Sequence, residues 1–171
     1  QNYMKKTFSP IRSVINEAID RSVKLHKNKG QRRGGATGYP DLDNLLAGLQ
    51  RSDLVILAAR PSVGKTSFAL DIVRNIGVRG KVPVGMFSLE MSKEQLVDRM
   101  LCSEANVDLW KMRTGRLSDR PEDDDFPRIG HAMGVLSEAP IFIDDAPNNN
   151  IMQIRTKARR LQMEHGLGLI V

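Results

Sequence analysis

The spacing of apolar residues predicts a chain in which short strands alternate with amphipathic helices. Residues 54–59 and 141–146 are short apolar runs of the kind found in strands buried in a parallel sheet. Residues 82–90 and 167–171 complete the expected strands. Between them, apolar residues recur at intervals of three and four, which predicts helices at 41–49, 66–77, 92–105, 128–139 and 151–166. This alternation indicates an α/β fold, with a mainly parallel sheet and helices on both of its faces.

Capping and turn residues set the expected ends of these elements. Gly48 and Gly77 follow helical patterns, so each is expected to terminate a helix. Ser92 and Gln95 have the spacing of a capping box, which predicts that a helix begins just after Ser92. The acidic stretch 118–128 is interrupted by prolines and is expected to be a surface loop.

A further amphipathic helix is predicted at residues 9–27, ahead of the alternating region. Ser9 is a suitable N-cap, and Pro10 fits the first helical position. Residues 28–38 contain four glycines and no large apolar residue, which is typical of a flexible linker. The helix must therefore bury its apolar face either on its own core or on a neighbouring subunit. We divide the chain into an N-terminal arm with this helix and basic linker, residues 1–38, and a core, residues 39–171.

Composition narrows the classes of protein to which the chain could belong. Its 171 residues are enough for one domain, and its single cysteine excludes an internal disulfide and fits a reducing, cytoplasmic compartment. No apolar run approaches the roughly 18 residues of a membrane span, so no membrane partner is expected. The net charge is +6, but residues 1–38 hold nine of the 26 Lys and Arg and only two of the 20 Asp and Glu. The core is therefore nearly neutral, and a solvated basic arm is favoured over a DNA-binding one.

Residues 59–66, Ala-Arg-Pro-Ser-Val-Gly-Lys-Thr, match the Walker A pattern except that Ala59 replaces its first glycine. A buried strand is expected before this loop and a helix after it, as the motif requires. Gly64 would let the backbone approach a phosphate chain, Lys65 would reach the β- and γ-phosphates, and the Thr66 hydroxyl would be a ligand of Mg²⁺. The sequence thus predicts an ATP site that includes Ser62, Val63, Gly64, Lys65, Thr66 and Ser67.

Acidic residues follow two of the expected strands. Glu90 ends the strand at 82–90, and ligands of open parallel sheets lie outside the carboxyl ends of the strands. Its carboxylate could deprotonate a water that attacks the γ-phosphate, or it could cap the next helix. Asp144 and Asp145 are candidates for the Mg²⁺-holding Walker B aspartate, although a turn at the end of a strand explains them equally well.

The stretches AARPSVGKT, at 58–66, and FSLEMS, at 87–92, together resemble the replicative DNA helicases of the DnaB type, in the RecA-like ATPase class. That family accepts alanine at the first Walker A position. Similar segments cover most of residues 9–171; they lie at 34–72, 84–102, 112–118 and 141–171.

The resemblance implies a RecA-like P-loop NTPase fold preceded by an amphipathic linker helix, with Glu90 and Lys65 as catalytic residues. Arg99 matches a helix arginine that reaches toward the γ-phosphate. The Walker B aspartate, the DNA-binding loops and an arginine finger would follow Val171, so Asp144 and Asp145 are interpreted as a turn. Residues 1–171 alone are then expected to hydrolyse ATP only weakly.

The same resemblance implies a function for the whole protein. It would be an ATP-dependent helicase that uses Mg²⁺ and moves along single-stranded DNA as a homo-hexamer in the replisome. Helix 9–27 would dock on the adjacent subunit, and primase and a helicase loader would be partners. Two alternatives stay open: a RecA-class recombinase, and a nucleotide-gated assembly ATPase that does not unwind DNA.

Overall fold

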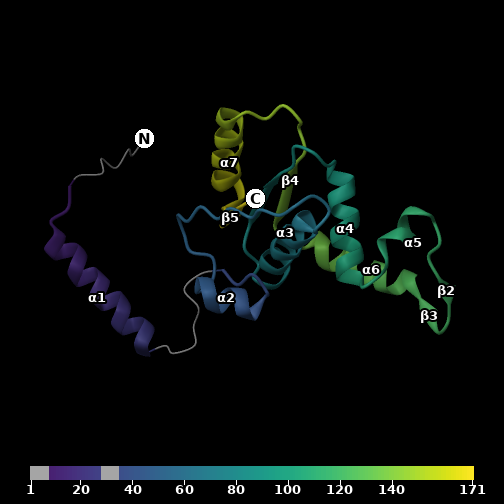
Figure 1. Cartoon of the computed structure of the whole chain (residues 1–171), viewed down its shortest axis with the longest axis horizontal. Coiled ribbons are helices and arrows are strands. Elements are labelled where there is room, and N and C mark those ends of the chain that lie inside the picture. Colours follow the sequence, from purple (N-terminus) through teal and green to yellow (C-terminus); the bar gives the residue numbers. More distant parts are fainter. Residues whose placement is uncertain (1–7, 28–34) are drawn as a thin grey trace. The chain divides into compact units, whose positions relative to one another are not determined.

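The computed structural model describes residues 8–27 and 35–171. Contacts divide the chain into two compact units, residues 1–33 and 34–171. In the first unit, helix α1 (Ile11–Lys27) confirms the predicted amphipathic helix (Figure 1). The helix begins one residue after Pro10, whose carbonyl oxygen accepts the Ser13 N–H at 3.1 Å. The first part of the expected linker, residues 28–34, lies outside the described residues.

The second unit alternates helices with strands that are short, and most of the helices lie where the sequence predicts them (Figure 1). Among residues 8–27 and 35–171, no helix combines the length and apolar character needed to cross a bilayer. The elements of this unit are α2 (Pro40–Leu46), α3 (Lys65–Arg74), the π-helix η1 (Asn75–Arg79), β1 (Val84–Phe87), α4 (Lys93–Ala105), α5 (Leu109–Arg113), β2 (Asp119–Arg120), β3 (Asp123–Asp124), α6 (Asp125–Ser137), β4 (Ile141–Asp144), α7 (Ile151–His165) and β5 (Leu169–Ile170).

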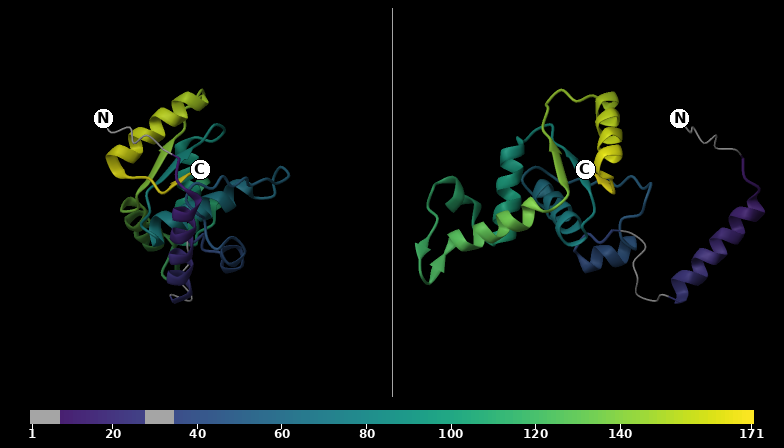
Figure 2. Two further views of the ribbon diagram at one scale, coloured as in Figure 1. Left: turned by 90° about the vertical axis from the view of Figure 1, so that its left-hand side faces the viewer. Right: turned by 180° about the vertical axis from the view of Figure 1, so that it is seen from behind.

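A parallel sheet with the strand order β4-β1-β5 forms the centre of this unit. Val84 and Met86 of β1 point into an apolar cluster with residues of α3 and α4. Gly85 lies between them and therefore faces the other side, where a Cβ would come within 2.9 Å of Leu161 in α7. Helices thus cover both faces of the sheet, as predicted, and Figure 2 shows α7 across the strands from α3 and α4. A second apolar cluster joins α4 to α6.

The predicted strand at 54–59 is wrong for this structure. Those residues form no strand in the described part of the chain, and Leu54 and Ile56 are 89% and 82% exposed. A strand obtains its hydrogen bonds from a neighbouring strand, and this segment pairs with none of the strands of the described sheet. The apolar character of residues 54–59 is therefore not sufficient to make them a strand.

The helix ends predicted at Gly48 and Gly77 have different outcomes. Helix α2 ends at Leu46, and both its C-cap Ala47 and the following Gly48 adopt left-handed conformations, with φ of 55° and 79°, so the glycine follows the helix end as predicted. Gly77 does not terminate α3, because the chain continues through the π-helix η1 to Arg79. Gly77 is buried inside that turn, where an added Cβ would lie 2.5 Å from Cγ1 of Ile141. The glycine is thus needed for close approach to β4, not to stop the helix.

The region 118–128 is more ordered than a surface loop. It contains the short antiparallel pair β2–β3, and α6 begins at Asp125, three residues earlier than predicted. Pro127 falls within the first turn of α6, where its missing N–H needs no partner. The sequence analysis also missed the short helix α5, which Asp108 caps by accepting the Trp110 N–H at 2.8 Å.

Candidate nucleotide-binding site

The loop before α3 has the backbone geometry of an anion cradle. Ser62 and Gly64 adopt left-handed conformations, with φ of 64° and 97°. Gly64 directly precedes α3, and its carbonyl oxygen accepts the Phe68 N–H at 2.9 Å, so the helix begins at the motif as predicted. No side chain among the described residues caps α3. The first N–H groups of the helix therefore stay available to a ligand, and the helix dipole favours a negative one.

A cleft of about 440 Å³ joins this loop to residues distant in the sequence. Glu90 and Arg99 lie on its walls, although they follow the motif by more than twenty residues. Val63, a predicted nucleotide-binding residue, does not line the cleft and is 69% exposed. The other predicted residues do line it: Ser62, Gly64, Lys65, Thr66, Ser67, Glu90 and Arg99.

The groups around the cleft fit a magnesium-bound polyphosphate. A Cβ built on Gly64 meets no atom within 4 Å, so the backbone there faces open space. Lys65 opens α3 with an exposed ammonium group, and the half-buried Thr66 adds a hydroxyl oxygen of the kind that binds Mg²⁺. Backbone donors, a cation and a hydroxyl thus surround one open space, which is the donor set that a nucleoside triphosphate requires.

Arg99 contributes a second positive charge from helix α4. Its Nη1 donates to the Ser67 hydroxyl at 3.4 Å, which holds the guanidinium beside the first turn of α3. Its Nε is buried and has no hydrogen-bond partner among the described residues. The guanidinium therefore has donor capacity left for an anion in the cleft.

Glu90 lies in a turn rather than at the end of a strand. Strand β1 ends at Phe87, so the expected strand 82–90 is shortened at both ends. At the end of β1 the backbone is still bonded to the segments on both sides of this central strand. The Phe87 N–H donates to the Val171 carbonyl, and the Ser88 N–H donates to the Asp144 carbonyl, both at 2.8 Å. Glu90 follows as an exposed residue that faces the cleft.

Glu90 is not the cap of helix α4. The Ser92 hydroxyl accepts the Gln95 N–H at 3.3 Å, and the Gln95 side chain accepts the Ser92 N–H at 3.2 Å, which confirms the predicted capping box. The carboxylate that accepts the first backbone N–H of this helix, that of Lys93, belongs to Asp145 and not to Glu90. The Glu90 side chain is thus available for chemistry in the cleft.

Asp144 and Asp145 have structural partners outside the cleft. Asp144 accepts hydrogen bonds from Lys157 Nζ at 2.7 Å and from the Asn149 amide at 2.8 Å. The Lys157 hydrogen bond is the main cause that lowers the pKa of Asp144 below its usual value. Asp145 accepts the Lys93 N–H at 2.9 Å. These contacts agree with the interpretation of the pair as a turn.

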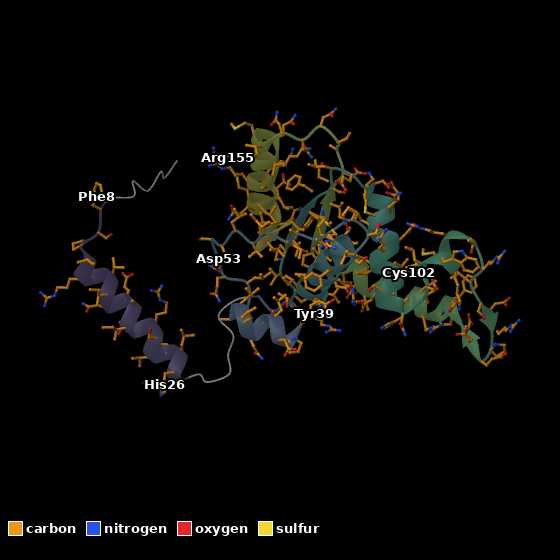
Figure 3. The ribbon with its side chains drawn as sticks, in the orientation of Figure 1. Phe8, His26, Tyr39, Asp53, Cys102 and Arg155 are labelled. Carbon is orange, nitrogen blue, oxygen red and sulfur yellow. The ribbon has the colours of Figure 1, made fainter. Side chains whose placement is uncertain are left out.

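Tyr39 supports helix α3 behind the loop, and the sequence analysis did not identify it. The Tyr39 side chain is labelled in Figure 3. Its ring packs against Phe68, with 4.8 Å between the ring centroids, and its hydroxyl donates to Asp71 at 2.9 Å. Burial and the Asp71 carboxylate raise the pKa of Tyr39. Only the three-dimensional structure brings this tyrosine to α3, because it lies 32 positions before Asp71 in the sequence.

Comparisons with known proteins agree with this geometry. Residues 34–171 match the family described as DnaB-like helicase C terminal domain. The chain is 46% identical over 164 residues to the "Replicative DNA helicase DnaC" of Bacillus subtilis (strain 168) and 48% identical over 164 residues to the "Replicative DNA helicase DnaB" of Geobacillus stearothermophilus. Each alignment covers 96% of this chain and 35% of the relative. The chain thus spans about a third of the length of these curated relatives.

Two solved structures have a similar fold. The "ATPase Domain of G40P" superposes with a TM-score of 0.84 at 25% identity, over 96% of this chain and 56% of that one. "The Structure Of A DnaB-Like Replicative Helicase And Its Interactions With Primase" superposes with a TM-score of 0.79 at 26% identity, over 96% of this chain and 38% of that one. Both support the α/β, RecA-like class that the sequence predicts.

Proposed function

The chain belongs to the DnaB-like helicase C-terminal domain family, and on that basis we propose that it is the ATP-binding part of a replicative DNA helicase. The observation that carries this proposal is the cleft, where a Walker A loop, Glu90 and Arg99 converge from three segments of the chain. The likeness to the curated helicases, which extends over nearly the whole chain, supports the same function.

ATP binds with its phosphates against the loop and the first turn of α3. The open backbone at Gly64 and the free N–H groups of α3 receive the phosphate oxygens, and Lys65 reaches the β- and γ-phosphates. The Thr66 hydroxyl would hold Mg²⁺, which neutralises charge on the phosphate oxygens when it is bound. Arg99 adds positive charge from helix α4, beside the first turn of α3.

Glu90 acts on the attacking water. Its carboxylate accepts a proton as the water oxygen bonds to the γ-phosphorus, and the bond between that phosphorus and the oxygen of the leaving ADP breaks. The products are ADP and inorganic phosphate. Glu90 suits this role because it faces the cleft and does not cap α4.

The whole protein would couple this hydrolysis to movement along single-stranded DNA as a homo-hexamer. Helix α1 supports the assembly, because Ile11, Ile15 and Ile19 form an apolar stripe that its own unit does not bury and that would dock on an adjacent subunit. Primase would be a partner, by likeness to the solved helicase whose title names primase. A helicase loader would be a partner by the family resemblance of the sequence. The replisome of the cytoplasm would be its place of action.

The proposal is tested on the full-length protein with Glu90→Gln, and Glu94→Gln is the matched control. Both glutamates are exposed near the start of α4, but Glu94 does not line the cleft. We expect Glu90→Gln to bind ATP nearly normally, to hydrolyse it on the order of a hundredfold more slowly, and to lose strand displacement on a forked duplex. Glu94→Gln is expected to match the wild type.

The outcomes separate the proposal from its alternatives. Normal turnover in Glu90→Gln refutes the role of Glu90. Turnover that single-stranded DNA stimulates in the wild type, without strand displacement, favours an ATPase that does not unwind. Strand exchange between homologous duplexes instead of unwinding favours a recombinase.

A further inference from the structure

The turn that carries Glu90 is fixed at its start by Ser88. The Ser88 hydroxyl donates to the Met91 carbonyl at 2.7 Å and accepts the Met91 N–H at 3.2 Å. These two bonds close a ring around Leu89 and Glu90. Since Ser88 is buried, water competes little for them. The turn therefore keeps a fixed relation to the end of β1.

A second attachment fixes the end of the turn. Lys93 is the first residue of α4, and the N–H of a first helical residue has no partner within its own helix. The carboxylate of Asp145 accepts this N–H at 2.9 Å from the end of the adjacent strand β4. A negative charge at this helix end is also favoured by the helix dipole. The contact joins α4 to the sheet just after Glu90.

The position of Asp145 is set in turn by its neighbour. Asp144 accepts the Ala146 N–H at 3.0 Å, the Asn149 amide at 2.8 Å and Lys157 Nζ at 2.7 Å, so the chain after β4 is tied to α7. The two adjacent aspartates thus bind different helices: Asp144 binds α7, and Asp145 binds α4. Helix α7, the end of β4 and the start of α4 form one connected frame behind Glu90.

We propose that Asp145 is a positioning residue that holds the Glu90 turn in place against the phosphate loop. The proposal rests on the function proposed above, because it assigns Asp145 an effect through Glu90. Without the Asp145 carboxylate, the first turn of α4 loses its attachment to β4, and Glu90 can shift relative to Gly64 and Lys65. A shift of about 1 Å in a reacting group can reduce a rate by up to a hundredfold. ATP affinity should change little, because most of the phosphate contacts come from the loop and the first turn of α3, and Arg99, farther along α4, is held by its hydrogen bond to Ser67.

The experiment measures steady-state ATP turnover by the full-length protein. We expect Asp145→Ala to lower kcat on the order of tenfold to a hundredfold and to change KM by less than about twofold. Asp145→Asn keeps an oxygen that can accept the Lys93 N–H, so it should stay within about threefold of the wild type. The matched control is Asp108→Ala, which removes an aspartate cap from α5, away from the cleft.

A double variant separates positioning from a loss of stability. If Asp145 acts through Glu90, then Asp145→Ala should slow single-turnover hydrolysis less than about twofold in a Glu90→Gln background, because coupled residues are not additive. The proposal is overturned if Asp145→Ala slows hydrolysis by the same factor in the wild-type and Glu90→Gln backgrounds. It is also overturned if Asp108→Ala lowers kcat as much as Asp145→Ala does, or if Asp145→Ala changes KM alone. Unchanged hydrolysis in Glu90→Gln itself would instead overturn the proposed function.

Discussion

Replacing Gly64 with alanine should separate nucleotide binding from folding. Gly64 has a φ of 97°, a left-handed conformation that L-residues with a side chain rarely adopt. An added Cβ would meet no atom within 4 Å, so the substitution causes no clash in the free protein. The remaining penalty is conformational, about 1–2 kcal/mol. In a protein of this size each kcal/mol lowers the melting temperature by roughly 2–4 °C.

The effect on binding should be larger than the effect on folding. The methyl group would project where the backbone faces the cleft, and it would keep phosphate oxygens away from the N–H groups of the loop. Hydrogen bonds to a charged group contribute about 1.5–3 kcal/mol each. The loss of one such bond weakens ATP binding by about tenfold to a hundredfold. Isothermal titration calorimetry with ATP and Mg²⁺ measures this change directly.

Gly115 is the matched control for this substitution. It has a φ of 67°, and its added Cβ also meets nothing within 4 Å, but it does not line the cleft. Gly115→Ala should therefore lower the melting temperature by a similar amount and leave ATP affinity unchanged. If Gly64→Ala binds ATP as tightly as the wild type, or if both variants lose affinity equally, then the loop does not bind phosphate as we infer.

Three further predictions follow from contacts described above. Lys65→Ala should weaken ATP binding in calorimetry by about tenfold or more, because a charge contact to phosphate is lost; equal affinity would contradict this. Ile15→Asp with Ile19→Asp should dissociate oligomers of the full-length protein, seen by light scattering, while its melting transition stays cooperative. The Lys157 hydrogen bond lowers the pKa of Asp144, so its ionised form stabilises the fold at neutral pH. That contribution is lost as the pH falls through the lowered pKa, so the difference in unfolding free energy between wild type and Asp144→Asn should shrink in acid and be constant above about pH 5.

Local signals in the sequence predicted the parts of the site that depend on neighbouring residues. The Walker A residues determine the turn at Gly64 and the start of α3, and both appear as expected. Ser92 and Gln95 predicted the start of α4 for the same reason, since the bonds of a capping box span only three residues. Such features need no knowledge of the fold.

The parts that the sequence did not predict depend on partners distant along the chain. Residues 54–59 are apolar enough for a strand. A strand also needs hydrogen bonds to a neighbouring strand, and residues 54–59 pair with no strand of the described sheet. The contact from Asp145 to Lys93 spans 52 positions, so no local pattern indicates it. Gly77 has the position of a helix terminator, but its role depends on Ile141 in another strand.

The close approach of Gly77 to Ile141 has a consequence for the evolution of this fold. An added Cβ at position 77 would lie 2.5 Å from Cγ1 and 2.8 Å from Cδ1 of that isoleucine, and neither separation is tolerable. Ile141 also opens β4 opposite Val84 in the central strand, so the register of the sheet fixes its backbone and only its side chain can move aside. A larger residue at position 77 therefore favours a smaller or differently oriented side chain at position 141. In related sequences, the residues at positions 77 and 141 should therefore change together. Such covariation would conserve the sum of their side-chain volumes and not the identity of either residue.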